Sequence, residues 1–222
     1  MLIGKMEIKI KELQYYYQEN QAIFKNLSVD FESQKITLIY GRSGSGKSTF
    51  LKCLCGLIKA KKGKIEFNNH DISMFNERKL ADFRLKNIGF VYQFFHLLPS
   101  LTVKENILLP ANLANLNAEQ RCQELLEKYD IQKLSQKWPE HLSGGEAQRV
   151  ALCRALINQA PVILADEPSG NLDRKNRDRV LKEFSRLRNE EEKSMIIVTH
   201  DEAFKEIADT ILHLENGQLM KQ

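Results

Sequence analysis

One short glycine-rich segment constrains the fold of this chain more than any other part of its 222 residues. Residues 41–49, GRSGSGKST, match the pattern G-x-x-x-x-G-K-[ST] of a phosphate-binding loop. A compact apolar run over 36–40 precedes the segment, and a helical pattern over 48–57 follows it. Because such a loop lies between a buried strand and a helix, the pattern predicts an α/β fold in which the loop follows one strand of a parallel sheet.

The residue types in this loop suit a polyphosphate. Its glycines allow successive backbone N–H groups to turn inward and form an anion-binding nest, and the start of the next helix adds a partial positive charge. Lys47 can reach the β- and γ-phosphates, and the Ser48 hydroxyl can bind Mg²⁺. A flexible Gly/Ser loop is the alternative, but such a loop rarely has Lys-Ser at this step between a strand and a helix. The predicted nucleotide-binding residues of the loop are Gly41, Ser43, Gly44, Ser45, Gly46, Lys47, Ser48 and Thr49.

Two acids follow an apolar run later in the chain. Residues 162–165, VILA, predict a buried strand, and Asp166 and Glu167 come directly after it. Asp166 can bind Mg²⁺ directly or through water, and Glu167 can accept a proton from an attacking water. Many strands end in acids, so this pair becomes specific only in combination with the phosphate-binding loop.

Composition limits the classes of partner. The net charge of +4 is too small to indicate nucleic acid, and no nucleic-acid partner is expected. No apolar run approaches 18 residues, so any membrane role is expected to come through a partner. The segment 1–10 lacks the apolar stretch of a signal peptide. Four scattered cysteines indicate reduced thiols and a cytosolic location.

The remaining patterns place the loop in a larger architecture. Apolar residues between 8 and 31 predict strands of an antiparallel lobe, and 102–157 is mostly helical, including an amphipathic helix over 119–129. Continuous apolar runs suit a parallel sheet that is buried on both faces. Asn216-Gly217 predicts a tight hairpin turn near the end. The predicted strands of the core and of the final hairpin are 36–40, 88–92, 162–165, 195–198, 211–214 and 218–220.

A family resemblance emerges from five further motifs. The segment 142–149, LSGGEAQR, resembles the signature sequence of ABC ATPases, which other P-loop NTPases lack. Gln93 matches the Q-loop of that family, Ser169–Asp173 its D-loop, and His200 its switch histidine. Tyr17 lies where the family stacks an aromatic ring on adenine, and Tyr15 and Tyr16 are its rivals for that role. The resemblance covers essentially the whole chain.

The resemblance implies a P-loop NTPase fold: a RecA-like parallel-sheet core, an N-terminal antiparallel β lobe and an inserted helical subdomain. It implies a single ABC ATPase domain over 1–222. About 1–93 and 158–222 would form the β lobe and core, and about 94–157 the helical subdomain. ATP and Mg²⁺ are the implied cofactors. The implied catalytic residues are Lys47, Gln93, Glu167 and His200, and the implied metal ligands are Ser48, Gln93 and Asp166.

The signature segment also predicts an anion-binding helix end. Ser143 and Glu146 fit the S-x-x-E capping box, so a helix should begin there. Gly144 and Gly145 leave its first N–H groups uncovered. The resemblance implies that this helix end binds the γ-phosphate of ATP held by a second copy of the chain. A homodimer would therefore form through two shared ATP sites.

The segment after the Q-loop indicates a branch of the family. Residues 94–106 resemble the lipoprotein-release, macrolide-efflux and cell-division subgroup. Its apolar cluster, Phe94, Phe95, Leu97 and Leu98, is either an exposed docking face for a membrane partner or part of the helical packing.

Three functions follow from the resemblance. The first is an ATPase on the inner face of the cell membrane that drives a separate transmembrane permease, for export or mechanical transmission. The second is an ATPase that regulates a membrane complex in cell division or envelope signalling without transport. The third, a soluble ATPase of DNA or translation, would need a coiled coil, a zinc insertion or tandem cassettes, and the sequence has none of these.

Overall fold

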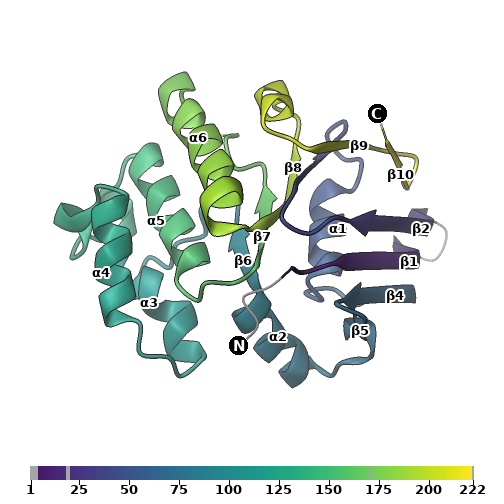
Figure 1. Cartoon of the computed structure of the whole chain (residues 1–222), viewed down its shortest axis with the longest axis horizontal. Helices are drawn as coiled ribbons and strands as arrows, with labels where there is room; N and C mark the ends of the chain where they lie inside the picture. The colour runs from purple at the N-terminus through teal and green to yellow at the C-terminus, as the bar shows by residue number, and fades with distance from the viewer. Residues whose placement is uncertain (1–4, 19–20, 171, 222) are drawn as a thin grey trace.

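The computed structural model describes residues 5–18, 21–170 and 172–221, and it is built around a six-stranded sheet (Figure 1). Five of its strands, in the order β9-β3-β8-β7-β6, pair in parallel, and β10 adds an antiparallel edge next to β9. The strands are β3 (Ile36–Tyr40), β6 (Ile88–Val91), β7 (Val162–Asp166), β8 (Ser194–Thr199), β9 (Thr210–Glu215) and β10 (Gln218–Lys221).

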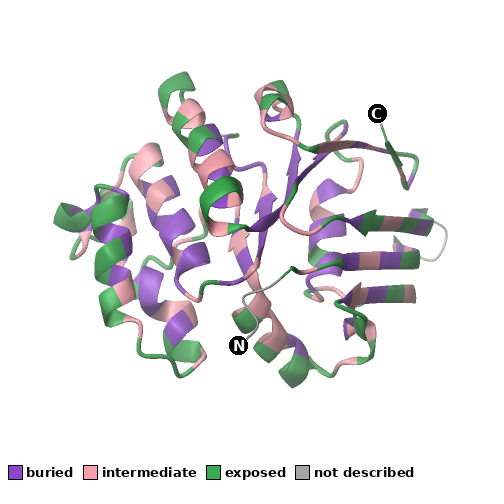
Figure 2. Cartoon of the chain, in the orientation of Figure 1, coloured by how far each residue is buried: buried purple, intermediate pink, exposed green. Residues whose placement is uncertain are grey.

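Both faces of this sheet are covered by apolar packing, as the continuous apolar runs predicted. Ile163 and Ala165 of β7 belong to one core cluster, whereas Val162 and Leu164 belong to the other. The alternation follows from the two-residue period of a strand. Figure 2 shows β7 and β8 as almost continuously buried.

A second, antiparallel sheet lies on the right of Figure 1 and forms the predicted β lobe. Its strand order is β2-β1-β4-β5, and its inward residues pack on α1 in the core cluster that contains Val162 and Leu164. The first two strands were predicted from their apolar residues, whereas β4 and β5 were missed. The strands are β1 (Ile8–Gln18), β2 (Gln21–Phe31), β4 (Lys62–Phe67) and β5 (His70–Asp71).

The helices divide between the two faces of the parallel sheet. Helix α1 packs in the cluster that contains Val162, and α5 packs in the cluster that contains Ile163. Helices α3, α4 and α5 lie together on the left of Figure 1, within the range predicted to be helical. The helices are α1 (Lys47–Leu54), α2 (Glu77–Asn87), α3 (Val103–Leu113), α4 (Glu119–Lys128), α5 (Gly144–Leu156) and α6 (Arg174–Glu191).

Helix α1 is shorter than the sequence predicted. It ends at Leu54, so Cys55 lies just beyond it rather than within it. Gly56 adopts a left-handed conformation (φ +65°) that ends the helix, and its Cα faces the Leu80 side chain. A Cβ at this position would come within 2.7 Å of Leu80.

The α/β fold prediction is confirmed, and so is the final hairpin: Asn216 (φ +49°) and Gly217 (φ +77°) form the turn between β9 and β10. All four cysteines are buried free thiols, and burial raises the pKa of Cys55 to about 11. Among the described residues, none of the helices combines the length and the apolar content needed to cross a lipid bilayer.

Candidate active site

The phosphate-binding loop, Asp166, Glu167 and His200 meet where three parallel strands end, whereas Ser143, Gly144 and Gly145 lie apart from them at the start of α5. Tyr40, the last residue of β3, pairs with Thr199, the last residue of β8. Asp166, at the end of β7, pairs with Val198. Because the strands are parallel and in register, the phosphate-binding loop, the two acids and the histidine emerge at one edge of the sheet.

The phosphate-binding loop turns directly into α1. Gly46 precedes the helix in the left-handed region (φ +99°), which a side chain would strain. A Cβ there would lie 2.8 Å from the Ile23 side chain. The hydroxyl oxygen of Ser45 is buried and has no hydrogen-bond partner among the described residues. The loop therefore contains a polar group that a bound ligand can satisfy.

The side chain of Lys47 folds back onto the backbone of the phosphate-binding loop. Its Nζ donates to the carbonyl oxygens of Gly41 (2.8 Å) and Arg42 (3.1 Å), and its side chain is buried. The same Nζ lies 3.9 Å from Oε1 of Glu167. A buried ammonium group at this edge is a strong attractor for a polyphosphate.

Asp166 and Ser48 are directly linked. The Ser48 hydroxyl donates to Oδ1 of Asp166 at 2.9 Å. Burial raises the pKa of the Asp166 carboxyl, and the Ser48 hydrogen bond opposes that rise. A hydroxyl and a carboxylate side by side are oxygen ligands of the kind that Mg²⁺ prefers.

The Glu167 side chain is buried, and its carboxylate is hydrogen-bonded to residues at the end of β8. Its Oε2 accepts hydrogen bonds from the Thr199 hydroxyl (2.7 Å) and the His200 backbone N–H (3.2 Å), and the His200 Nδ1 lies 3.0 Å away. The backbone of Glu167 is left-handed (φ +45°), a conformation that costs a non-glycine residue energy and that clusters at functional sites. Thr199 was missed by the sequence analysis, although it directly precedes the predicted switch histidine.

The predicted Q-loop and D-loop residues lie near each other. A Cβ on Gly170 would be 3.5 Å from Nε2 of Gln93. The Ser169 hydroxyl donates to the Asp201 carboxylate at 2.8 Å, which links the D-loop to the residue after His200. Asn171, also predicted in the D-loop, lies outside the described residues.

The three tyrosines have different environments. Tyr15 is buried, and the Lys61 Nζ lies 5.5 Å from the centre of the Tyr16 ring. Tyr17 is 63% exposed, and its hydroxyl lies 3.2 Å from Oγ1 of Thr49 in the loop. Of the three, Tyr17 alone combines an exposed ring with a contact to the loop.

Helix α5 begins with the predicted capping box. The Ser143 backbone N–H and hydroxyl both donate to Oε2 of Glu146 at 2.7 Å, and these bonds lower the pKa of that carboxyl. A Cβ on Gly145 would meet the Asn176 side chain at 2.5 Å, so this glycine permits the close approach of α5 and α6.

The apolar cluster after the Q-loop is split. Phe94 (63%) and Leu98 (42%) are exposed, whereas Leu97 packs against the core cluster that contains Ile163. The carbonyl oxygen of Phe95 accepts a hydrogen bond from Arg154 of α5. Packing therefore accounts for Leu97, and the exposed residues Phe94 and Leu98 are the part for which docking stays a prediction.

Comparisons with known proteins show what the chain is similar to. The model of the family described as "ABC transporter" matches residues 24–170. The chain is 40% identical to the lipoprotein-releasing system ATP-binding protein LolD of Bacteroides fragilis, over 89% of this chain and 93% of that protein. It is 38% identical to the ABC transporter ATP-binding protein YtrE of Bacillus subtilis, over 91% and 89%.

A solved structure is similar over nearly the whole fold. It is a dimeric, post-hydrolysis state of the ATP-binding cassette MJ0796 bound to ADP and Pi, with a TM-score of 0.89 and 31% identity over 97% of each chain. The predicted resemblance to the lipoprotein-release subgroup is confirmed by the LolD relatives. The chain therefore belongs to the ABC transporter family, as an ATP-binding and ATP-hydrolysing member.

Proposed function

We propose that this chain forms a homodimer around two ATP molecules and drives a separate membrane permease. The observation that carries the proposal is the meeting of Lys47, Asp166, Glu167 and His200 at one edge of the parallel sheet. These groups provide a cation for phosphate, an acid for metal and a base for water within one small volume.

The phosphate loop fits a triphosphate with its metal. Backbone N–H groups of 41–49 and the start of α1 would surround the phosphates, and the unpartnered Ser45 hydroxyl would gain an acceptor. Lys47 would exchange its two carbonyl partners for phosphate oxygens. Ser48, Asp166 and Gln93 would bind Mg²⁺, which supplies charge neutralisation of the transferred phosphoryl group.

The hydrolytic step is assigned to Glu167. Its carboxylate would orient a water molecule and accept its proton as the water attacks the γ-phosphorus and the bond to ADP breaks. His200, with its side chain 67% exposed beside that carboxylate, would contact the γ-phosphate. Tyr17 is assigned to adenine, since its exposed ring lies next to the loop.

The position of the signature helix supports the proposed dimer. Helices α5 and α1 pack on opposite faces of the sheet, so each phosphate-binding helix end belongs to a different side of the chain. Ser143, Gly144 and Gly145 would bind the γ-phosphate of ATP held by a second copy. The similar cassette solved as a dimer supports this arrangement.

The permease contact is assigned to the helical side of the molecule. A hollow of about 220 Å³ is lined by Tyr92 and Arg154, close in sequence to the exposed Phe94. A short amphipathic helix of a membrane protein would bury that ring and fill the hollow. We assign about 94–157 to a helical subdomain that carries this face, and the chain to the inner surface of the cell membrane.

The substrate class is proposed from the relatives. Because a lipoprotein-releasing ATPase is 40% identical to the chain, release of a lipoprotein, peptide or drug-like molecule from the membrane is the favoured activity. Regulation of a membrane complex without transport is the alternative.

Copurification tests the proposal. The tagged chain, coexpressed with a candidate membrane permease, should retain that permease in detergent, and its ATPase activity should change when the two are bound. Phe94→Glu should abolish retention and leave basal hydrolysis intact. Met220→Glu changes an exposed apolar residue on β10, and this variant should still retain the membrane protein. Equal retention by both variants would contradict the docking face. If both variants keep basal hydrolysis but no membrane protein is retained by any form of the chain, the permease assignment is contradicted.

A further inference from the structure

The segment after β6 makes two tight turns in succession. The Phe95 backbone N–H donates to the Tyr92 carbonyl oxygen at 3.1 Å, so Gln93 is the second residue of a four-residue turn. The His96 backbone N–H donates to the Phe94 carbonyl oxygen at 2.5 Å and closes a three-residue turn. The place of the Gln93 side chain therefore depends on the conformation of the residues directly after it.

The second turn has a strained backbone. Phe95 and His96 are both left-handed, with φ of +60° and +47°. Bulky side chains rarely adopt this region, and a three-residue turn whose central residue has positive φ is the rare, strained form. Such strain persists only where surrounding contacts enforce it. The segment therefore requires contacts that hold it in this conformation.

Arg154, in the last turn of α5, provides these contacts. Its Nη2 donates to the Phe95 carbonyl oxygen at 2.5 Å, and its Nη1 donates to the His96 carbonyl oxygen at 2.6 Å. One planar guanidinium thus holds both left-handed residues with a rigid pair of donors. The His96 ring also stacks on the Tyr92 ring, with centroids 4.7 Å apart.

Close packing of α5 on β6 brings Arg154 to this segment. A Cβ on Gly89 of β6 would lie 2.3 Å from the carbonyl oxygen of Ala155, so a larger residue would push the helix away from the strand. Arg154 is the neighbour of Ala155, and its side chain reaches the residues that follow β6.

Packing alone does not explain an arginine at this position. The Arg154 side chain is half-buried, and burial lowers the pKa of its guanidinium. Among the described residues, its hydrogen bonds go to backbone carbonyls and it forms no ion pair with a carboxylate. Removing a cation from water without a carboxylate beside it costs free energy, which an apolar side chain would avoid.

We propose that Arg154 is a positioning residue for Gln93: by holding Phe95 and His96 in the left-handed conformation, it fixes the turn that directs the Gln93 amide to the metal. Without Arg154, the two residues would relax to negative φ and Gln93 would lose its place. The inference rests on the proposed role of Gln93 at Mg²⁺, and it does not depend on the permease.

Amide hydrogen exchange of the nucleotide-free chain tests the structural step. Arg154→Met keeps a long apolar stem and removes the donors, so the amides of 92–97 should exchange at least about tenfold faster, while those of α1 should not change. Arg78→Met, at an exposed arginine on α2, is the control and should leave both segments unchanged. Unchanged exchange of 92–97 in Arg154→Met would overturn the inference.

Mg²⁺ dependence tests the functional step. In Arg154→Met, kcat should fall about tenfold and the Mg²⁺ concentration for half-maximal hydrolysis should rise, whereas ATP affinity measured without Mg²⁺ should not change. A smaller folded fraction would lower kcat without shifting the Mg²⁺ midpoint. Phe95→Gly should restore about fivefold of the lost rate, because glycine adopts positive φ without steric cost. A normal Mg²⁺ midpoint in Arg154→Met, or no recovery with Phe95→Gly, would overturn the inference.

A double-mutant cycle separates this inference from the proposed function. If Arg154 acts through Gln93, the chain with both Arg154→Met and Gln93→Ala should be no slower than Gln93→Ala alone. Multiplied losses would show that Arg154 acts independently, and would overturn the inference while leaving the metal role of Gln93 intact. A wild-type Mg²⁺ midpoint in Gln93→Ala would contradict that metal role itself, and the positioning role with it.

Discussion

The Nδ1 atom of His200 lies 3.0 Å from Oε2 of Glu167, so the histidine after β8 and the acid after β7 form a direct pair. The same oxygen accepts the Thr199 hydroxyl, which in turn accepts the Asp201 backbone N–H at 3.0 Å. The proposed base is therefore oriented by the neighbouring strand. Its other oxygen, Oε1, is the one nearer Lys47.

Thr199 should act as a positioning residue for Glu167. Thr199→Val keeps the volume of this fully buried side chain but removes its hydrogen bond. We expect kcat to fall about tenfold, the worth of roughly one such bond, with little change in the KM for ATP. Thr199→Ser should restore kcat. Steady-state phosphate release separates the two constants, and a Thr199→Val enzyme with normal kcat would remove Thr199 from the site.

Lys47→Ala should weaken ATP binding by about two orders of magnitude, because a buried cation and its charge-assisted hydrogen bonds are lost. Lys52→Ala, an exposed lysine on the same helix, is the matched control and should bind normally. Fluorescent-nucleotide titration measures both. Wild-type affinity and turnover in Lys47→Ala would contradict the assignment of the phosphate loop.

The parts of the fold that were predicted share a physical cause. Strands β3, β7 and β8 are buried on both faces, so nearly every residue in them is apolar and the runs are visible in the sequence. The catalytic motifs follow those strands directly. Once the strands are arranged in parallel, the motifs that follow them necessarily lie close together at one end of the sheet.

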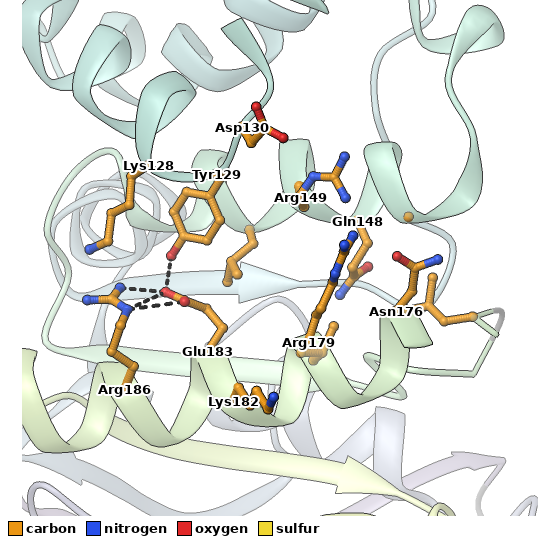
Figure 3. A pocket seen from close by; sticks show the side chains of 14 residues that line it. Lys128, Tyr129, Asp130, Gln148, Arg149, Asn176, Arg179, Lys182, Glu183 and Arg186 are labelled. Atoms are coloured by element: carbon orange, nitrogen blue, oxygen red, sulfur yellow. Dashed lines mark hydrogen bonds and ion pairs between the residues drawn. The ribbon is translucent and has the colours of Figure 1, made fainter. Parts of the chain in front are cut away.

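Other features depend on contacts that no short segment contains. Helix α6 buries only four residues among many charged ones, so the apolar periodicity that indicates a helix is weak in its sequence. The buried residues are Val180, Leu181, Phe184 and Leu187. The bond from Thr199 to Glu167 depends on the register of β7 against β8. The cavity between α4, α5 and α6 (Figure 3) is lined by basic side chains that the sequence separates by up to 58 positions, from Lys128 to Arg186.

Ser143→Arg tests whether two copies share each site. The long cation would block the helix end, so the variant alone should not hydrolyse ATP. Mixed with Glu167→Gln chains, it should regain at most one working site per dimer, combining Lys47 and Glu167 of one chain with Ser143 of the other. Ser143→Asn preserves a small capping side chain and is the control for helix stability. Full activity of Ser143→Arg as a monomer would refute the shared site.

Asp166→Asn should stabilise the protein without nucleotide while weakening Mg²⁺-dependent binding. Burial raises the pKa of this carboxyl in the folded state, so the ionised form destabilises folding at neutral pH. The cost decreases as pH falls through the raised folded pKa and is absent below the unfolded pKa. Thermal melting of Asp166→Asn should therefore exceed wild type at neutral pH and converge with it in acid. Asp82→Asn, at an exposed position, should show no such difference.

Glu167→Gln should separate binding from chemistry. The amide oxygen can still accept from Thr199 and the His200 backbone, so the side chain should keep its place. Its basicity is lost, and general-base assistance is worth about 10²–10⁴-fold in rate. ATP affinity should be unchanged or higher, because a negative charge near the γ-phosphate is removed.

The variant should accordingly bind ATP and Mg²⁺, hydrolyse hardly at all, and accumulate as an ATP-bound dimer. Size-exclusion chromatography with ATP, alongside phosphate release, measures both properties, and Asp166→Asn should instead bind ATP poorly in Mg²⁺. Hydrolysis near the wild-type rate would show that Glu167 is not the base. A slow variant that stays monomeric with ATP bound would preserve the catalytic role but contradict dimer closure by this chain alone, and the membrane subunit would then be required to align the two halves.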